Sequence, residues 1–254
     1  MQPINFDLVA DIYDIYVNVT TDIPFFIKET EGVNDTILEL MCGTGRVSVP
    51  LLKEGRKLVC VDYSNGMLDS LKAKLYDNNF TADVIKADIT KMNLERKFKM
   101  ILLPFNSLSE ILEPEKQKQA LVNISNHLET GGTFICTLQN PKVRLQTTDG
   151  VQRTLGEFPI STNNRLIVSY VNNWDAESGL VTGYQYYEIL DNKDNFLGKR
   201  ILEINFRPVS DADFREMIKE TGLEVAEAYG DYTYVPFDEE NSSFIIYKLI
   251  KNRR

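Results

Sequence analysis

The stretch Ile37-Leu-Glu-Leu-Met-Cys-Gly-Thr-Gly-Arg-Val47 decides the fold. It begins with an apolar run that is typical of a buried strand, and Gly43-Thr-Gly45 then marks a turn before a helical pattern. In open α/β sheets, ligands bind in the crevice outside the carboxyl ends of such strands. Glycine at this position lets the backbone approach a ligand without an intervening Cβ atom. The stretch therefore predicts a ligand site at the carboxyl end of a buried strand.

The segments on either side of this turn alternate between strand and helix. We expect strands at residues 36–41, 57–61, 82–86, 99–105 and 133–138, with helices at 46–54, 64–75 and 115–128. Such alternation is typical of a parallel sheet that is covered by helices. The same pattern returns after residue 207, with a helix at 210–220 and strands at 223–229 and 243–249, which could pair as an antiparallel edge hairpin.

Between these two parts lies a segment with a different pattern. Three stretches at residues 165–174, 180–190 and 199–206 alternate with period two, and turn-like residues separate them. They predict an antiparallel β insertion after the fifth strand. The overall prediction is an α/β fold, namely a doubly wound, Rossmann-like and mostly parallel seven-stranded sheet with this insertion.

Three successive strands of the predicted sheet carry carboxylates, Glu39, Asp62 and Asp88. A carboxylate in the position of Asp62 can accept hydrogen bonds from both hydroxyls of a ribose, and Asp88 can accept one from the exocyclic amine of adenine. Ser48 stands where a dinucleotide fingerprint has its third glycine, so no phosphate cradle is predicted. The pattern favours an adenosine with a cationic, non-phosphorylated tail. In a plainer interpretation, the glycines form a tight turn, Asp62 caps a helix and Asp88 is a solvated loop residue.

The composition excludes several other functions. The formal charge is −9, from 28 basic and 37 acidic side chains, and it disfavours binding to nucleic acid. The single histidine, His127, cannot form a multi-histidine metal site, so we expect no metal and a structural role for this residue. Cys42, Cys60 and Cys136 are odd in number and far apart, so no disulfide framework follows. Residues 1–7 do not resemble a signal peptide and no apolar run is long enough to span a bilayer, so we expect a cytoplasmic protein with no membrane partner.

Four motifs resemble, in this order, those of the class I S-adenosylmethionine-dependent methyltransferases. They are Leu38-Glu-Leu-Met-Cys-Gly-Thr-Gly-Arg46, Val61-Asp-Tyr-Ser-Asn-Gly-Met67, Lys86-Ala-Asp-Ile-Thr90 and Ile101-Leu-Leu-Pro-Phe-Asn-Ser107. The resemblance covers about residues 5–140 and 205–250, and it implies S-adenosyl-L-methionine as the cofactor. It departs at Met41, where the family usually has glycine. The expected domains are a cofactor-binding domain, residues 1–140 and 208–254, and an insertion at 141–207 that caps the substrate.

The resemblance implies roles for the residues at the methionine end of the cofactor. Glu39 and the backbone of residues 42–45 would face the methionine part, and Arg46 would lie near its carboxylate. Tyr13 and Tyr16 resemble residues of an N-terminal lid, from which a tyrosine hydroxyl could bond the same carboxylate. In plainer interpretations, Arg46 pairs with a surface acid and the two tyrosines only pack the N-terminal helix.

The resemblance also implies roles at the nucleoside end. Asp62 would hold the ribose, Met67 would pack on the adenine, and Asp88 with Ile89 would frame the adenine edge. The turn at Pro104–Asn106 would border the reacting sulfonium. The full expected set of cofactor contacts is Tyr13, Glu39, Cys42, Gly43, Gly45, Arg46, Asp62, Tyr63, Met67, Ala87, Asp88, Ile89 and Pro104.

The insertion resembles that of small-molecule N-methyltransferases, including those that act on amino sugars and glycine. Methyl transfer from an activated cofactor depends mainly on proximity and alignment, and a neutral amine needs little help from a base. The scarcity of candidate bases therefore favours a nitrogen acceptor. The catalytic candidates are Asn106, Glu110 and Tyr13, and the substrate-binding candidates are Asn106, Glu110, Arg144, Tyr184, Arg207 and Tyr232.

Other functions stay open at this stage. An O-methyltransferase on a small metabolite, an RNA or protein methyltransferase and a non-catalytic cofactor-binding module are the alternatives. Leu103-Pro-Phe-Asn-Ser107 stands where nucleic-acid enzymes of this family would have an Asn-Pro-Pro-Tyr type motif, and the net charge also disfavours a nucleic-acid partner. We expect a small-molecule substrate, and the sequence does not distinguish a monomer from a homodimer.

Overall fold

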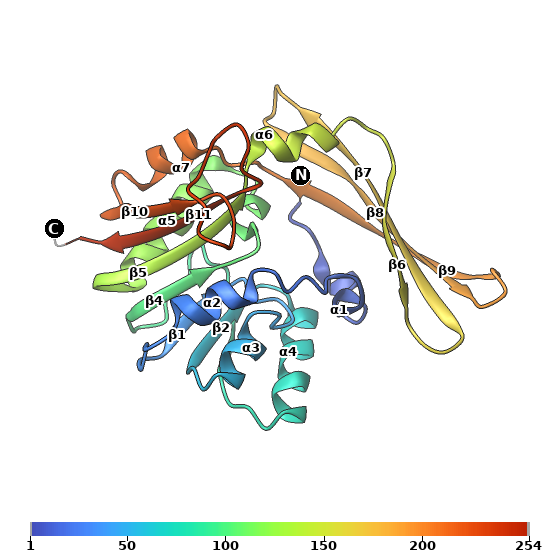
Figure 1. Cartoon of the computed structure of the whole chain (residues 1–254), viewed down its shortest axis with the longest axis horizontal. Helices are drawn as coiled ribbons and strands as arrows, with labels where there is room; N and C mark the ends of the chain where they lie inside the picture. Colours follow the sequence, from blue (N-terminus) through green and yellow to red (C-terminus); the bar gives the residue numbers. More distant parts are fainter. Residues whose placement is uncertain (1, 253–254) are drawn as a thin grey trace.

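The apolar run of the opening stretch forms β1 (Ile37–Leu40), which is fully buried in the larger of two sheets. The computed structural model describes residues 2–252. The larger sheet has seven strands in the order β10-β11-β5-β4-β1-β2-β3 (Figure 1). Its other strands are β2 (Leu58–Asp62), β3 (Asp83–Lys86), β4 (Phe98–Leu103), β5 (Leu128–Gln139), β10 (Leu223–Tyr229) and β11 (Phe244–Lys251).

The pairing of these strands places the site. β1, β2, β3, β4 and β5 are parallel, so their carboxyl ends meet at one edge of the sheet. β11 runs antiparallel to both β5 and β10. The strand order reverses between β1 and β4, and a ligand crevice is expected outside the carboxyl ends at such a switch point.

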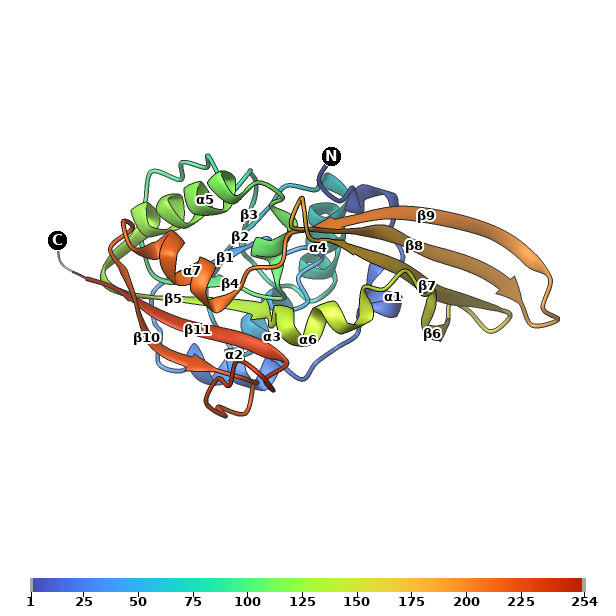
Figure 2. The same ribbon diagram turned by 90° about the horizontal axis from the view of Figure 1, so that it is seen from above.

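Helices cover both faces of this sheet (Figure 2). One face packs against α2 (Ile23–Glu29), α3 (Ser48–Lys53) and α4 (Asn65–Asp77), and the other against α5 (Pro114–His127) and α7 (Asp211–Ile218). The strands alternate between the two cores, since Leu38 and Leu40 of β1 pack on the α5 side whereas Ile37 packs on the α3 side. Ser64 caps α4, and its hydroxyl accepts a hydrogen bond from the Met67 amide at 3.1 Å.

The smaller sheet is the insertion, and it projects away from the rest of the molecule (Figure 2). Its antiparallel strands are β6 (Arg153–Pro159), β7 (Asn164–Asp175), β8 (Leu180–Asp191) and β9 (Phe196–Phe206), in that order. The chain reaches it from β5 through α6 (Pro141–Arg144) and η3 (Leu145–Thr147).

The N-terminal segment packs against one face of the insertion. This segment, residues 2–16, contains η1 (Phe6–Leu8) and α1 (Tyr13–Tyr16). A separate apolar core joins it to the insertion, and its buried members are Val9, Ile12, Tyr16, Leu166, Val168, Tyr187 and Leu202. The Tyr16 and Tyr187 hydroxyls are 2.9 Å apart within this core.

The predicted fold class is confirmed, but some predicted elements are wrong in detail. The insertion has four strands, because Arg153–Pro159 pairs at its edge although it contains Gly156 and ends at a proline. α3 begins at Ser48, because Gly45 has a φ of 84° and the chain is still turning there. β5 begins at Leu128, so the glycines before residue 133 lie within the strand. No helix within residues 2–252 is long and apolar enough to cross a membrane.

Candidate active site

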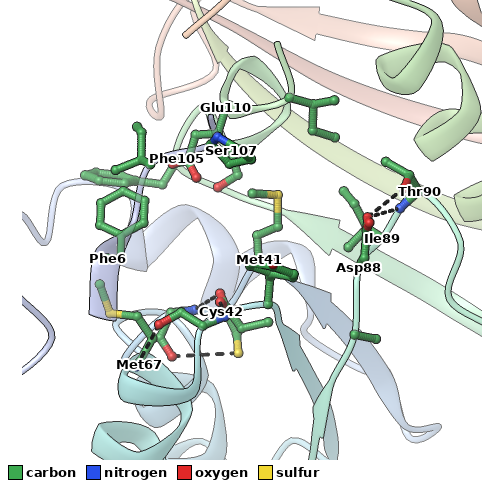
Figure 3. Close-up of a pocket in the computed structure, with 18 of the residues that line it drawn as sticks. Phe6, Met41, Cys42, Met67, Asp88, Ile89, Thr90, Phe105, Ser107 and Glu110 are labelled. Atoms are coloured by element: carbon green, nitrogen blue, oxygen red, sulfur yellow. Dashed lines mark hydrogen bonds between the residues drawn. The ribbon is translucent and has the colours of Figure 1, made fainter. Parts of the chain in front are cut away.

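A cavity of about 410 Å³ lies at the carboxyl ends of β1, β2, β3 and β4 (Figure 3). This volume is within the usual range of small-molecule sites. The N-terminal segment borders it with Gln2, Pro3, Ile4 and Phe6. The predicted site residues that line it are Tyr13, Glu39, Cys42, Gly43, Arg46, Asp62, Tyr63, Met67, Ala87, Asp88, Ile89, Pro104 and Glu110.

The turn after β1 has a left-handed backbone at three of its residues. Met41, Gly43 and Gly45 have φ values of 51°, 56° and 84°. A Cβ atom on Gly45 would lie 2.4 Å from Leu71 Cδ1, so this glycine lets the turn pack against α4 and does not itself line the cavity. Met41 stands where the similar family usually has glycine, and it adopts the left-handed backbone that glycine favours. Its side chain extends into the cavity (Figure 3).

Asp62 fixes this turn from the end of β2. Its two carboxylate oxygens accept hydrogen bonds from the Gly43 amide at 2.8 Å and from the Ser64 amide at 2.9 Å. Burial raises the pKa of Asp62, although these hydrogen bonds act in the opposite direction. Each carboxylate oxygen has a second lone pair, so Asp62 can still accept hydrogen bonds from a ligand.

Glu39 is almost completely buried behind the turn, with 1% of its surface exposed. The Ser48 hydroxyl donates a hydrogen bond of 2.7 Å to its carboxylate. Burial raises the pKa of Glu39 to about 7, and the hydrogen bond from Ser48 only partly offsets this effect.

Arg46 forms an ion pair with Asp22. Its guanidinium donates to both Asp22 oxygens at 2.6 Å and to the Val19 carbonyl at 2.8 Å. It also lies 4.4 Å from the centre of the Phe105 ring. Asp22 is only 1% exposed, so Arg46 pairs with a buried acid rather than with one on the surface.

Asp88 stands after β3 at the far side of the cavity. Its carboxylate accepts hydrogen bonds from the Thr90 amide at 2.9 Å and from the Thr90 hydroxyl at 2.7 Å. Burial would raise its pKa, but these bonds and the ammonium of Lys91 outweigh burial and lower it. Ala87, Ile89 and Met67 supply an apolar lining beside this carboxylate.

Three carboxyl groups around the cavity lack a cationic partner among the described residues. The cations of the cavity already pair with acids, as Arg46 with Asp22, Lys91 with Asp88 and Lys116 with Glu113. By contrast, Glu39, Asp62 and Glu110 have no ion-pair partner within residues 2–252. The cavity therefore presents unpaired carboxyl groups, which suit a positively charged ligand.

Several predicted residues lie outside the cavity lining. Asn106 accepts hydrogen bonds from the Gln139 amide at 2.9 Å and from the Ser109 hydroxyl at 3.0 Å, so its side chain fixes the turn after β4. Tyr232 packs against the Phe25 and Phe26 rings.

The other three lie on or beside the insertion. The Arg144 guanidinium stacks over Phe206 at 5.0 Å, and Arg207 donates to the backbone carbonyls of Leu112 and Ser178. Tyr184 is 48% exposed on the insertion.

His127 has two structural hydrogen bonds. Its Nδ1 donates to the Asn123 carbonyl at 2.8 Å, and its Nε2 accepts from the Leu94 amide at 3.0 Å. No group of residues within 2–252 is arranged to hold a metal ion.

The sequence patterns missed one functional residue. Asp7 of η1 accepts hydrogen bonds from the Ser64 hydroxyl and from the Gly66 amide at 2.8 Å, and it thereby ties the N-terminal segment to the start of α4. No local pattern marks this contact, because its partners lie far away in the sequence.

The molecule combines a mostly parallel sheet, in which the antiparallel β11 lies between β5 and β10, with a cavity at the switch point. Solved methyltransferase structures share this fold. A S-adenosylmethionine-dependent methyltransferase from Clostridium acetobutylicum superposes with a TM-score of 0.80 at 21% identity, over 98% of this chain and 99% of that one.

Sequence comparisons also find methyltransferases. A family model described as a methyltransferase domain matches residues 37–132. The cypemycin N-terminal methyltransferase of a Streptomyces species is 28% identical over 53% of this chain and 53% of its own length. A dTDP-3-amino-3,4,6-trideoxy-alpha-D-glucopyranose N,N-dimethyltransferase of Streptomyces venezuelae is 25% identical over 50% and 55%. The matches thus span about half the length of these curated relatives. Residues 37–132 therefore match a methyltransferase domain, and the chain shares its fold with solved S-adenosylmethionine-dependent methyltransferases.

Proposed function

We propose that this protein transfers a methyl group from S-adenosylmethionine to an amine nitrogen of a small molecule. The observation that carries the proposal is a set of carboxyl groups in the cavity, Glu39, Asp62 and Glu110, which lack cationic partners within residues 2–252. A sulfonium cofactor and a protonated amine are both cations, so both suit such a cavity.

The residues present fit the cofactor. Asp62 has free lone pairs toward the cavity and would accept hydrogen bonds from the ribose hydroxyls. A Cβ atom on Gly43 would meet nothing within 4 Å, so there is open space beside this backbone for the methionine part. Met67 and Ile89 would enclose the adenine, with Asp88 at its edge. When bound, the cofactor would supply an activated methyl group on a positively charged sulfur.

The protein's own contribution would be to align the acceptor and to exclude water. Phe6 and Tyr13 border the cavity from the N-terminal segment, and Phe105 and Ser107 border it from the turn after β4. The insertion, residues 141–207, packs on the N-terminal segment from outside, and we propose that it caps the substrate.

Nitrogen is favoured over oxygen as the acceptor atom for two reasons. A hydroxyl acceptor needs a strong base, whereas a neutral amine already has its lone pair available. One relative is named as an N,N-dimethyltransferase of an amino sugar nucleotide, and another as an N-terminal methyltransferase of cypemycin.

A label-transfer screen tests the proposal. The protein and methyl-labelled S-adenosylmethionine would be incubated with amino sugars, amino acids and short peptides, and with the matching alcohols in which hydroxyl replaces the amine. We expect label in at least one amine and none in its matched alcohol. Label only in alcohols or in added tRNA or ribosomal RNA would replace the proposal by one of the alternative methyltransferase functions. Cofactor binding without transfer to any acceptor would favour a non-catalytic binding module.

A further inference from the structure

The Glu110 carboxyl is the one acid of the cavity for which neither the fold nor the cofactor supplies a partner. It is the last residue of η2 (Ser107–Glu110), which follows β4. Figure 3 shows it beside Ser107 at one end of the cavity, with Cys42 and Met67 at the other end. Within residues 2–252, no hydrogen bond or ion pair reaches this side chain.

The surroundings of Glu110 explain the raised pKa of its carboxyl group. Enclosure by the protein raises its pKa to about 8, and the negative charge of Asp62 acts in the same direction. Other charged or titratable groups line the same cavity. They are Tyr13 from α1, Glu39, Cys42 and Arg46 around the β1 turn, Tyr63 after β2, Asp88 and Lys91 after β3, and Glu113 and Lys116 at the start of α5. The three cations among them are each paired with another acid.

We infer that Glu110 binds the acceptor amine and accepts its proton, an inference that rests on the function proposed above. A carboxyl in an enclosed site without a partner is costly, and an incoming ammonium group would supply the missing charge-assisted hydrogen bond. The proton transfer is balanced: an N–H bond breaks, an O–H bond forms on Glu110, and the electron pair stays on nitrogen. The amine is then neutral, and its lone pair is available for methylation.

The acidity of Glu110 suits this role. A general base works best when its pKa lies near the operating pH, because it is then a good proton acceptor and still partly ionised. An ordinary exposed glutamate, with a pKa near 4.3, would hold an ammonium group but would take its proton poorly. The position of Glu110 in the cavity and its pKa therefore both support a role as the proton acceptor.

A binding comparison tests the inference without turnover. Calorimetry would measure S-adenosylhomocysteine, whose sulfur is neutral, and sinefungin, an analogue with an ammonium group where the cofactor carries its methyl sulfonium. We expect the wild type to prefer sinefungin, and Glu110→Gln to reduce this preference roughly 10- to 100-fold, as for loss of one charge-assisted hydrogen bond. Glu115→Gln, which removes an exposed acid outside the cavity, should keep the wild-type preference.

The outcomes separate the two proposals. If neither nucleoside binds the wild type, the proposed function is wrong. If both bind and Glu110→Gln keeps the full preference for sinefungin, the cofactor site stands and the role of Glu110 is overturned.

A pH profile gives a second test on an amine that the label screen identifies. Glu110→Gln should lower kcat/KM by roughly 10²- to 10⁴-fold at neutral pH, and Glu110→Asp should restore part of it. The defect should shrink as the pH rises past the pKa of the free amine, because the substrate then arrives without its extra proton. A defect of the same size at every pH would indicate a structural role and contradict the inference.

Discussion

Asp62 has two functions that a single carboxylate can combine. It holds the Gly43 and Ser64 amides and thereby shapes the turn after β1, and it also lines the cavity where we propose that the ribose binds. The choice between a helix cap and a cofactor ligand, which the sequence left open, is therefore not exclusive. The two amide hydrogen bonds fix the orientation of the Asp62 carboxylate, and with it the direction of the lone pairs that remain free for a ligand.

Replacing Asp62 should affect both functions. We expect Asp62→Ala to weaken the binding of S-adenosylmethionine by at least roughly 10-fold and to lower the free energy of unfolding by about 1–3 kcal/mol, since two partly buried amides lose their acceptor. Calorimetry and urea denaturation would measure the two effects. Asp69→Ala, an exposed acid on α4, is the control and should change neither. Unchanged cofactor affinity in Asp62→Ala would leave only the structural role.

Glu110 should make stability depend on pH in a direction unusual for an acid. Because its folded pKa is about 8, the folded state holds a proton that the unfolded state has lost, so the free energy of unfolding falls as pH rises from about 4.5 to 8. Glu110→Gln cannot titrate and should therefore gain stability over wild type at pH 8.5, by up to a few kcal/mol, and little at pH 5. Thermal unfolding across this range would measure the difference, and parallel curves for the two proteins would contradict it. The raised pKa of Glu39 also makes stability fall with pH, but it does so equally in both proteins, so it does not affect the difference between them.

At the residue scale, the sequence patterns predicted the location of a side chain where that location depends on a local strand end. Asp62 and Asp88 follow directly from the strand–turn pattern, and both line the cavity. The patterns were less informative for Arg144, Arg207 and Tyr232, because backbone carbonyls or aromatic rings from distant segments already engage these side chains. Such partners are set by tertiary contacts, which no local pattern reveals.

The N-terminal segment is the element that closes the cavity, and one residue anchors it to α4. Asp7 accepts two hydrogen bonds at the positive end of this helix, from the Ser64 hydroxyl and the Gly66 amide. These bonds lower the pKa of Asp7, so its contribution to stability is present at neutral pH and is lost as pH falls through the lowered pKa.

Removing this anchor should loosen the segment. We expect Asp7→Ala to weaken cofactor binding severalfold and to speed amide hydrogen exchange in residues 2–12, with a loss of about 0.5–2 kcal/mol as for other lost helix caps. Asp77→Ala at the other end of α4 should have no such effect. Unchanged exchange in Asp7→Ala would show that the apolar core alone holds the segment.

At the element scale, the sequence patterns failed at edges and turns. β6 was missed because Gly156 and Pro159 are residues that argue against a strand, yet an edge strand tolerates both. The start of α3 was placed too early, since Arg46 and Val47 fit a helical pattern but still belong to the turn that Gly45 begins.

For the molecule as a whole, the insertion and the methyltransferase fold are joined through the N-terminal segment. The core around Tyr16 and Tyr187 connects them, and Arg200 of β9 adds an ion pair with Asp11. Periodicity predicted the insertion, but it could not predict this contact, because Tyr16 and Tyr187 are 171 residues apart in the sequence.

Weakening this core should therefore affect the distant cavity. Leu202→Ala removes a side chain that is 1% exposed and should cost about 2–5 kcal/mol. We also expect weaker cofactor binding and faster proteolysis of residues 2–16. The neighbouring Ile201 points to the opposite face and is 51% exposed, so Ile201→Ala is the matched control. If Leu202→Ala binds the cofactor as wild type does, the insertion does not support the site.

The central claim is that the cavity at the ends of β1, β2 and β3 is a S-adenosylmethionine site. Calorimetric titration of the wild-type protein with S-adenosylmethionine, S-adenosylhomocysteine and NAD tests it most directly. The unpaired carboxyl groups and the absence of a third glycine in the turn predict micromolar binding of both sulfur nucleosides and no binding of NAD. Binding of NAD, or no binding of either sulfur nucleoside at micromolar concentrations, would contradict the claim.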